Sequence, residues 1–462
     1  MMKFNKVGAA AILATVFSAS FSVQAATEAD AAKLGKELTP VGAEKGANKD
    51  GSIPAWAGNE PQASGWSYGK SRAEAWKHKG DKPLYTIDAS NVDKYAAQLS
   101  PGQVQLIKQS KGYKMDVYPS RRTCANPDFV VENTKKNATT AKIGADGWSL
   151  KEAMVPGIPF PLPKTGTEAM WNVKMKYAGV GFEYPTLYTA LSPRPGSSDW
   201  IAATSTQTYY FPWGKKGATA LSSLPPVEYF TYFSYKSPTA LAGQSLAITN
   251  YLDKTNEVFY YFPGQRRVRR MPTYAYDAPQ IGFENQYTMD EPRMFNGTIE
   301  RFDWKLVGKK ELIVGYNAFG MYDPNVKFND VAKDDGVASA NRRYEQHRVW
   351  VVEATVKQGV RHVAPKRTFY IDEDSWAIVV AEDYDAQGKL WKLREGFVIP
   401  VYETGSCDNP AFVQYNLVDN RYLVDQSSLG AGKDMRWFVE ANDPKLKEGF
   451  YTSDNLRAIS ER

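Results

Sequence analysis

The chain has 462 residues, 43% of them hydrophobic and 13% aromatic, which is ample for a large core and too long for one average domain. Its formal net charge of +6 is close to neutral for this length, and basic residues are interspersed with acidic ones except between Arg266 and Arg270. This balance argues against a nucleic-acid partner.

The first 25 residues have the pattern of a secretory signal peptide. Lys3 and Lys6 precede an apolar run at 7–21, and Val23-Gln24-Ala25 supplies a small-residue cleavage site, so we expect cleavage after Ala25. No later run has the uninterrupted apolar length of a spanning helix. The sequence therefore predicts an exported protein that is soluble outside the cytoplasm.

Residues 26–165 are expected to form an N-terminal segment of short helices and irregular chain. Helices are predicted at 27–38, 91–98 and 100–110, the last capped by Ser100 with Pro101 at its first position. The stretch 39–80 is rich in Gly, Pro, Asn and Ser and should wrap over a surface. Residues 121–150 show no strong periodicity, and the prolines at 156–163 make an extended connector.

Residues 166–462 are expected to form an antiparallel β domain. After a helix predicted at 167–177, the apolar period changes to two. Strands are predicted at 200–211, 227–235, 245–252, 257–271, 300–306, 310–316, 347–357, 367–371, 377–384, 389–394 and 397–402. Because most links are short and no helices alternate with the strands, we expect a meander rather than a doubly wound sheet.

The stretch EVFYYFPGQRRVRRM at 257–271 is predicted to be a hairpin with a type II turn at Pro263-Gly264. The strand before the turn is apolar on both faces, and the strand containing Trp350 repeats this pattern. An antiparallel pair usually leaves one face to water, so the second face needs a cover made of protein or of a bound apolar ligand.

The two cysteines, Cys124 and Cys407, lie in similar surroundings, TCANPDFV and SCDNPAFV. An exported chain with only two cysteines most simply pairs them, and the bridge would join the N-terminal segment to the C-terminal end. Two free buried thiols are the alternative.

Two groups of residues are candidates for ligand binding, each with a structural alternative. Arg266, Arg267, Arg269 and Arg270 could hold an anionic head group, or could form ion pairs with acids such as those near Glu284 or Asp290. The aromatic candidates could line a cavity or fill the core; they are Tyr229, Phe230, Tyr232, Phe233 and Tyr235 of one strand, together with Tyr260, Phe262 and Trp350.

No catalytic residue, metal site or cofactor is expected. The nucleophile-elbow spelling GWSYG at 65–69 lacks a preceding strand and a following helix. The three histidines, His78, His347 and His362, are not at metal-ligand spacing with one another or with a cysteine. The acids at 372–374 lie at a predicted turn, where solvated carboxylates are ordinary.

Four motifs together resemble a known family. LTPVGAEK at 38–45, GSIPAW at 51–56, PFPLPKTG at 159–166 and YFPGQRRVRR at 261–270 are similar to the domain-of-unknown-function 1329 (DUF1329) family of exported bacterial proteins. The hairpin, with FYID at 369–372 and YDAQGKL at 384–390, is similar to outer-membrane lipoprotein-sorting proteins of the LolA and LolB type.

The resemblance implies an α+β, mainly β fold: a large curved antiparallel sheet, or half-open barrel, with helices covering its concave face and an apolar cavity for acyl chains. It further implies a periplasmic lipid or lipoprotein carrier, partnered by an exporter of the resistance-nodulation-division type or by an outer-membrane protein. A periplasmic carbohydrate-binding or hydrolytic protein is the alternative. The N-terminal segment, which such carriers lack, could fill the cavity.

Overall fold

The computed structural model describes residues 26–461 except Asn59, Pro61, Gln62, Ser64, Thr273 and Ala275. The predicted signal peptide and its cleavage site therefore lie outside the described residues. No helix within the described part of the chain combines the length and apolarity needed to cross a membrane.

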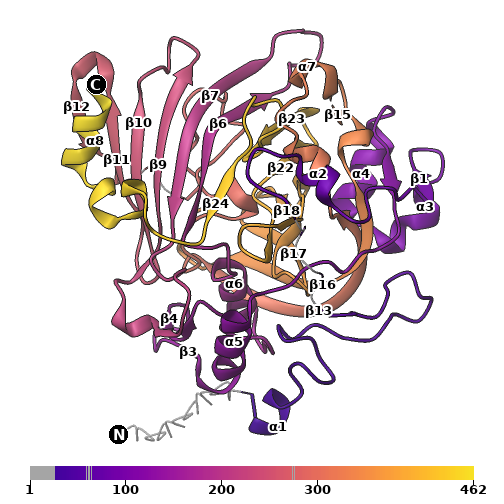
Figure 1. Ribbon diagram of the computed structural model, residues 1–462. Helices are drawn as coiled ribbons and strands as arrows, with labels where there is room; N and C mark the ends of the chain where they lie inside the picture. Colours follow the sequence, from indigo (N-terminus) through magenta and orange to yellow (C-terminus); the bar gives the residue numbers. More distant parts are fainter. Residues whose placement is uncertain are drawn as a thin grey trace, which may run out of the picture.

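A sixteen-stranded sheet dominates the structure (Figure 1). Its strands follow the order β1 (Tyr85–Ile87), β2 (Met115–Val117), β16 (Tyr344–Val356), β17 (Lys366–Asp372), β18 (Ile378–Tyr384), β19 (Leu390–Gly396), β22 (Phe412–Asn416), β23 (Arg421–Asp425), β6 (Gly181–Leu191), β7 (Ile201–Tyr210), β9 (Val227–Ser237), β10 (Ser245–Tyr251), β11 (Glu257–Phe262) and β12 (Arg267–Arg270). In addition, β13 (Phe302–Gly315) pairs with β16, and β24 (Arg436–Phe438) pairs with β6.

The sheet consists of two meanders joined side by side. Strands β6 to β12 form one and strands β13 to β23 the other, and they meet where β23 pairs with β6 at Leu423 and Leu191. Every pair is antiparallel except the contact of β2 with β16. Within the described residues the terminal strands β1 and β12 do not pair with each other, so the sheet is not closed into a barrel. The predicted mainly β fold with a large antiparallel sheet is confirmed.

Short helices lie around this sheet. Ser100 and Gln103 form a reciprocal capping box at the start of α4 (Pro101–Gln109), as the Ser-Pro pair predicts, and α4 packs on β19. Helix α6 (Gly166–Lys174) packs on β13 and β16. The other helices are α1 (Glu28–Ala31), α2 (Arg72–Ala75), α3 (Val92–Tyr95), α5 (Asp128–Thr140), α7 (Phe328–Val331) and α8 (Ser453–Ser460).

Among the described residues, four two-stranded ribbons lie outside the main sheet. They are β3 (Lys142–Ile143) with β4 (Leu150–Glu152), β5 (Met154–Val155) with β8 (Thr219–Ala220), β14 (Ala332–Lys333) with β15 (Gly336–Val337), and β20 (Ile399–Val401) with β21 (Ser406–Asp408).

Protein covers both apolar faces of the β9–β11 region. On the inner face, Val258 and Tyr260 pack against Tyr274 in the segment at 271–299 between β12 and β13. On the outer face, Tyr261 packs against Leu456 of α8, which Figure 1 shows alongside β11 and β12. The second cover that the two-faced strand requires is thus the chain's own C-terminal helix. On the inner face the covering segment comes directly after β12 in the sequence. The N-terminal segment, which the sequence made a candidate for this role, does not supply it.

The predicted hairpin exists, but its predicted turn is wrong. Residues Pro263–Gln265 form a 3₁₀ turn, and the left-handed residue is Arg266 (φ 49°) rather than Gly264. The loop is therefore longer than a two-residue type II turn. Strand β12 begins only at Arg267.

Several element predictions were also wrong. Strand β6 was missed because Pro185 interrupts its pattern; the proline lies at a bulge between Tyr184 and Leu187, where no ladder hydrogen bond is required. The two strands predicted at 300–306 and 310–316 are one strand, β13, which is bent at a similar bulge. Helix α5 was missed within 121–150, and α1 is much shorter than predicted.

Candidate functional site

The basic hairpin, defined as Arg266, Arg267, Arg269 and Arg270, is exposed at the β12 edge of the sheet. Arg270 forms an ion pair with Glu257 at 2.9 Å, and Arg269 donates to Gln265 Oε1 at 2.6 Å. The ion-pair alternative thus holds for Arg270, whose partner Glu257 lies on the adjacent strand, but the acids named as partners were the wrong ones. Glu284 accepts from Arg194 and Arg421, and Asp290 accepts from Arg367.

The aromatic candidates lie in three separate places. Tyr260 and Phe262 stack on each other at 4.4 Å on the inner face. Tyr232 lies on the outer face against Phe450. Trp350 belongs to the other meander, where it stacks on Trp376. The structure therefore does not bring the eight predicted ligand-binding residues together.

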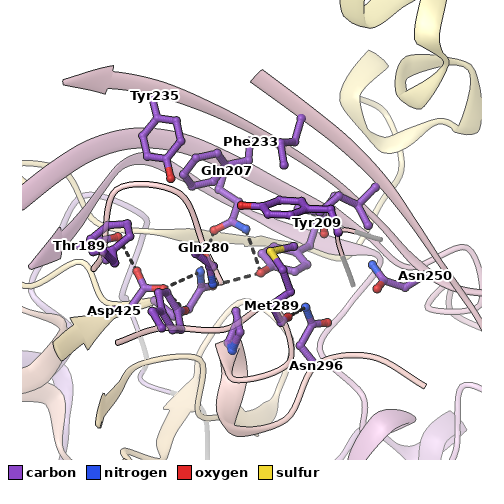
Figure 2. Close-up of a pocket in the computed structure, with 18 of the residues that line it drawn as sticks. Thr189, Gln207, Tyr209, Phe233, Tyr235, Asn250, Gln280, Met289, Asn296 and Asp425 are labelled. Atoms are coloured by element: carbon purple, nitrogen blue, oxygen red, sulfur yellow. Dashed lines mark hydrogen bonds between the residues drawn. The ribbon is translucent and has the colours of Figure 1, made fainter. Parts of the chain in front are cut away.

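A cavity of about 50 Å³, here called the inner cavity, lies between β6, β7, β9 and β10 and the covering segment at 271–299 (Figure 2). Its wall combines aromatic, aliphatic, hydroxyl and amide side chains, including Gln207, Tyr209, Tyr229, Thr231, Ile248 and Asn250. Since a water needs only about 10–15 Å³ of such volume, the cavity holds a few waters or a group of a few heavy atoms.

Most polar groups of the inner cavity bind one another. Gln207 Nε2 donates to the Tyr209 hydroxyl at 2.9 Å, and Gln426 Nε2 donates to Gln207 Oε1 at 2.9 Å. Asp425 accepts hydrogen bonds from Thr189 and Tyr287, and burial raises the pKa of its carboxyl. Figure 2 shows Asp425 and Thr189 at one end of the cavity and Asn250 at the other.

Arg293 lies among aromatic rings next to the inner cavity. The guanidinium of Arg293 is 5.1 Å from the ring centre of Phe182, 5.4 Å from Tyr209 and 5.9 Å from Tyr229. Its backbone is left-handed (φ 55°), and Asp408 is its carboxylate neighbour at 3.9 Å. This is cation–π geometry, and it places a fixed positive charge beside two tyrosines of the cavity wall.

A much larger hollow, here called the β13 groove, opens beside the first residues of β13. Its volume is about 880 Å³, and it lies between the β3–β4 ribbon, the connector at 160–165 and β13. Partly exposed apolar side chains line it, namely Ile143, Trp148, Phe160, Leu162 and Trp304. Pockets of drug-sized ligands have volumes of about 300–1,000 Å³, so this groove has the capacity for an organic ligand.

The β13 groove also has charged groups at its margin. Lys142 and Lys357 line it from two elements, and Lys142 pairs with Glu152 at 3.0 Å. Glu168, near the start of α6, accepts from the Lys164 backbone N–H, and burial raises the pKa of its carboxyl. The groove thus presents apolar walls with both signs of charge nearby.

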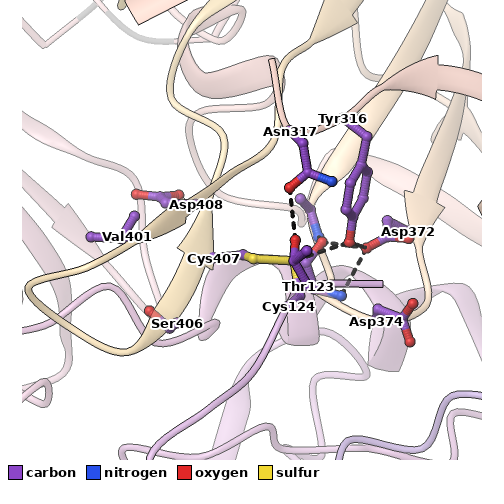
Figure 3. Close-up of a disulfide and its surroundings, with 12 residues drawn as sticks. Thr123, Cys124, Tyr316, Asn317, Asp372, Asp374, Val401, Ser406, Cys407 and Asp408 are labelled. Carbon is purple, nitrogen blue, oxygen red and sulfur yellow. Dashed lines mark hydrogen bonds between the residues drawn. A yellow bond between two sulfur atoms is a disulfide. The ribbon is translucent and has the colours of Figure 1, made fainter. Parts of the chain in front are cut away.

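Cys124 and Cys407 form the predicted disulfide, with Cα atoms 5.4 Å apart (Figure 3). The Tyr316 hydroxyl lies 3.0 Å from Cys124 Sγ and donates to Asp372 Oδ2 at 3.0 Å, and its ring stacks on His347 at 3.6 Å. The bridge joins the N-terminal segment to the β20–β21 ribbon.

The acids at 372–374 are buried, so their predicted solvated position is wrong. Asp372 and Asp374 lie with His347 in a group whose candidate ligand atoms are within 4.8 Å of one another. Sequence spacing did not reveal this group because His347 comes from β16 and the acids from the end of β17. Arg122 donates to both oxygens of Asp374 at 2.8 Å, so that carboxylate is already neutralised. The arrangement is that of an ion-pair network.

Burial and the negative charge of Asp374 raise the pKa of Asp372 to about 6. The GWSYG motif lies in turns and irregular chain, and no strand precedes it among the residues that are described there. These positions give no nucleophile–base pair of the kind that hydrolytic catalysis needs among the described residues.

Sequence reasoning named Tyr229, Phe233 and Tyr235 of the inner cavity, but it missed the polar residues of that cavity and the residues of the β13 groove. Thr231 and Asn250 are polar residues at inward positions of otherwise apolar strands, and that break in the pattern was the available signal. Ile143 and Trp148 lie where no periodicity was detected, so only the tertiary structure places them beside Trp304.

Comparison with known proteins gives the following likenesses. The model of the family described as protein of unknown function (DUF1329) matches residues 86–457. The uncharacterized protein PA3922 of Pseudomonas aeruginosa is 38% identical over an alignment of 445 residues that covers 94% of this chain and 94% of the relative.

Solved structures show weaker similarity. A "putative outer membrane lipoprotein-sorting protein domain" from Vibrio parahaemolyticus has a TM-score of 0.43 at 14% identity, covering 63% of this chain and 98% of its own. A DUF1329 family protein from Desulfovibrio piger has a TM-score of 0.40 at 12% identity, covering 62% and 98%. The LolA superfamily protein NE2245 from Nitrosomonas europaea has a TM-score of 0.35 at 11% identity, covering 63% and 99%.

These TM-scores are below 0.5, so the fold assignment rests on the strand pairing itself. The family assignment rests on the match over most of the sequence and on the full-length relative. The chain belongs to the DUF1329 family.

Proposed function

We propose that this protein is a carrier that binds the acyl chain of a lipid or lipidated cargo in the β13 groove. The observation that carries the proposal is the groove itself, with its 880 Å³ volume and its partly exposed walls of Ile143, Trp148, Phe160, Leu162 and Trp304. Contiguous apolar walls that remain open to solvent mark a ligand-binding groove more often than core.

The groove replaces the site expected from the sequence. An acyl chain was expected in the concavity of the sheet, but the segment at 271–299 covers that face and leaves only about 50 Å³. Neither Tyr260 nor Trp350 lines the inner cavity. The proposed site for the chain is therefore the groove beside β13, which has the larger volume.

The energetics suit reversible carriage. Burial of a methylene contributes about 0.8 kcal/mol, so about ten buried methylenes contribute about 8 kcal/mol before the costs of association. The net affinity is then in the range from which a cargo can be released to a partner. Lys142 and Lys357 at the margin offer ammonium groups to an anionic head group.

The proposal includes a periplasmic location, supported by the signal peptide pattern at 1–25, and delivery to an outer-membrane or resistance-nodulation-division type partner. The basic hairpin is the proposed contact for an anionic surface of that partner, since its arginines are exposed at a sheet edge. The alternative of a carbohydrate-binding or hydrolytic protein gains no support from the acids at 372–374, which are all buried, with Glu373 and Asp374 held in ion pairs.

The test is binding of a long-chain fatty acid that bears a fluorophore. Ile143→Glu introduces a charge into the groove wall and should weaken binding at least tenfold, because a carboxylate would face the chain. Val307→Glu is the matched control, since Val307 is 50% exposed on β13 and does not line the groove. Equal affinities of the two variants, or no binding by the unmodified protein, would refute the carrier proposal.

A further inference from the structure

The inner cavity contains two buried polar atoms that no described residue satisfies. They are Thr231 Oγ1 and Asn250 Oδ1, on side chains that are 4% and 1% exposed. Thr231 pairs with Ile248, and Asn250 pairs with Tyr229, so the two are diagonal neighbours on the inner face of β9 and β10. A buried hydroxyl or amide without a partner is unfavourable, so the pair is arranged for a guest that hydrogen-bonds to both.

The other polar groups of the wall are not available in this way. Gln207, Tyr209 and Gln426 bind one another, and Asp425 accepts from Thr189 and Tyr287. The unsatisfied pair is therefore the place where a guest gains most from a hydrogen bond.

The charges around the cavity favour a neutral guest. The guanidinium of Arg293 lies behind Tyr209 and Tyr229, which opposes a cation at those rings. The carboxyl of Asp425 lines the other end, which opposes an anion. A quaternary ammonium group would also leave Thr231 and Asn250 without partners.

The remaining wall is apolar and the space is small. Phe233, Leu246 and Ile248 present rings and methyl groups, against which carbon–hydrogen groups can pack. A volume of about 50 Å³ restricts the guest to a few heavy atoms. We propose that the inner cavity is a second binding site, for a small neutral diol or triol, either free or as the hydroxylated end of a larger molecule.

The experiment is a titration of the full mature chain with glycerol, observed by NMR of isotope-labelled isoleucine methyl groups. Ile248 lines the inner cavity, Ile143 lines the β13 groove, and Ile313 is buried in β13 away from both. We expect a saturable shift of the Ile248 methyl signal with no matching shift at Ile313.

Two variants and one control test the assignment. Thr231→Val, which keeps the shape and removes the hydroxyl, should raise the Kd for glycerol at least tenfold, and Asn250→Ala should do the same. Thr208→Val is the matched control, because Thr208 is buried on the opposite face of β7. The Kd of this variant for glycerol should equal that of the unmodified protein. A non-saturating shift, or equal Kd values for both variants and the unmodified protein, would overturn the proposal.

A second arm separates the two sources of the hydroxyl groups and keeps this site distinct from the groove. If a monoacylglycerol displaces glycerol at Ile248, the guest is the end of a lipid; if it shifts Ile143 alone while glycerol still saturates Ile248, the guest is a free polyol. If no acyl ligand shifts the Ile143 methyl signal, the carrier proposal is refuted, whereas saturable glycerol binding at Ile248 would still support the inner-cavity site.

Discussion

The two meanders of the sheet are stabilised by different interactions. The aromatic half, β6 to β12, packs rings on rings, as in the stack of Tyr210, Phe230 and Tyr451. The ionic half, β13 to β23, has a buried chain of charges in which Asp383 accepts from both Arg367 and Arg394. Directional ion pairs fix the positions of the side chains that form them, whereas packed aromatic rings can leave small cavities between them.

This difference suggests separate roles for the two halves, with the ionic half as the rigid scaffold and the aromatic half as the place of the inner cavity. Both halves contain buried polar atoms without partners, but in the aromatic half two of them, Thr231 Oγ1 and Asn250 Oδ1, face one cavity. The β13 groove lies where the outermost strand of the ionic half meets the N-terminal segment. We infer that the ionic half fixes the frame on which both hollows depend.

The largest effect is expected when the charge chain of the ionic half is broken. Asp383→Ala leaves the guanidinium groups of Arg367 and Arg394 buried without their shared carboxylate. Removing one partner of a buried ion pair costs about 3–5 kcal/mol, so the urea midpoint should fall sharply. Glu152→Ala, in an exposed pair with Lys142, is the control and should leave the midpoint unchanged. A loss below about 1 kcal/mol in Asp383→Ala would contradict the scaffold role.

A smaller loss is expected when the disulfide is removed. The bridge closes a loop across a sequence separation of 283, and replacing both cysteines, Cys124→Ser with Cys407→Ser, should reduce the free energy of unfolding by about 2–4 kcal/mol. Thermal unfolding of the unmodified protein in reductant should show the same shift. An unchanged Tm in both experiments would mean that the bridge does not hold the N-terminal segment to the ionic half.

Weakening the contact of α8 with the outer face should destabilise the aromatic half locally. Leu456 of α8 is fully buried against Ala247 and Tyr261, and Leu456→Ala should reduce stability by about 2 kcal/mol through the lost contacts and the cavity that remains. Hydrogen exchange should accelerate in β10 and β11 but not in β17 and β18. Val439→Ala, at a position 40% exposed, is the control with little expected change. Uniform acceleration across both halves would remove the distinction between them.

A last effect, confined to acidic pH, is a change in the slope of stability with pH that arises at the end of β17 in the ionic half. Asp372 has a pKa of about 6 in the folded protein against an ordinary value of 3.8, because burial and the charge of Asp374 disfavour its ionised form. Between these values the folded protein binds a proton that the unfolded chain has released. This group therefore contributes stability at low pH that is lost as the pH rises to about 6, with a slope of at most about 1.4 kcal/mol per pH unit.

Asp372→Asn should remove that slope. An asparagine oxygen can still accept from Ser375 and Tyr316, as Asp372 Oδ2 does. Free energies of unfolding measured across pH 4 to 6 should then show a difference between variant and unmodified protein that changes with pH. A constant difference would show that Asp372 does not titrate in this window.

Local patterns revealed much of the fold in advance. The Ser100-Pro101 start of α4, the period-two strands and the cysteine pair each depend on nearby residues or on a count, and each is confirmed. Strand β6 was missed since its proline is tolerated only at a bulge, which is a property of the pairing with β7.

The candidate sites could not be predicted from local sequence patterns, because they are formed by residues that lie far apart in the sequence. The apolar strand Glu257–Phe262 correctly indicated a second cover, but whether α8 or a ligand supplies it depends on residues almost two hundred positions away. The β13 groove is assembled from a ribbon, a connector and a strand end, none of which is distinctive alone. Burial of the acids at 372–374 likewise depends on Arg122 and Lys309, which lie far from them in sequence.

Arg122 has a consequence for the order in which this polypeptide can fold. Its guanidinium binds the backbone oxygens of Glu44 and Pro54 on one side and the carboxylate of Asp374 on the other. Glu44 and Pro54 are made early in translation, whereas Asp374, to which Arg122 ties them, is made about 320 to 330 residues later. During that interval the leading part of the nascent chain has no finished surface to close on, so its final docking is a late event, and such long-range closure is intrinsically slow.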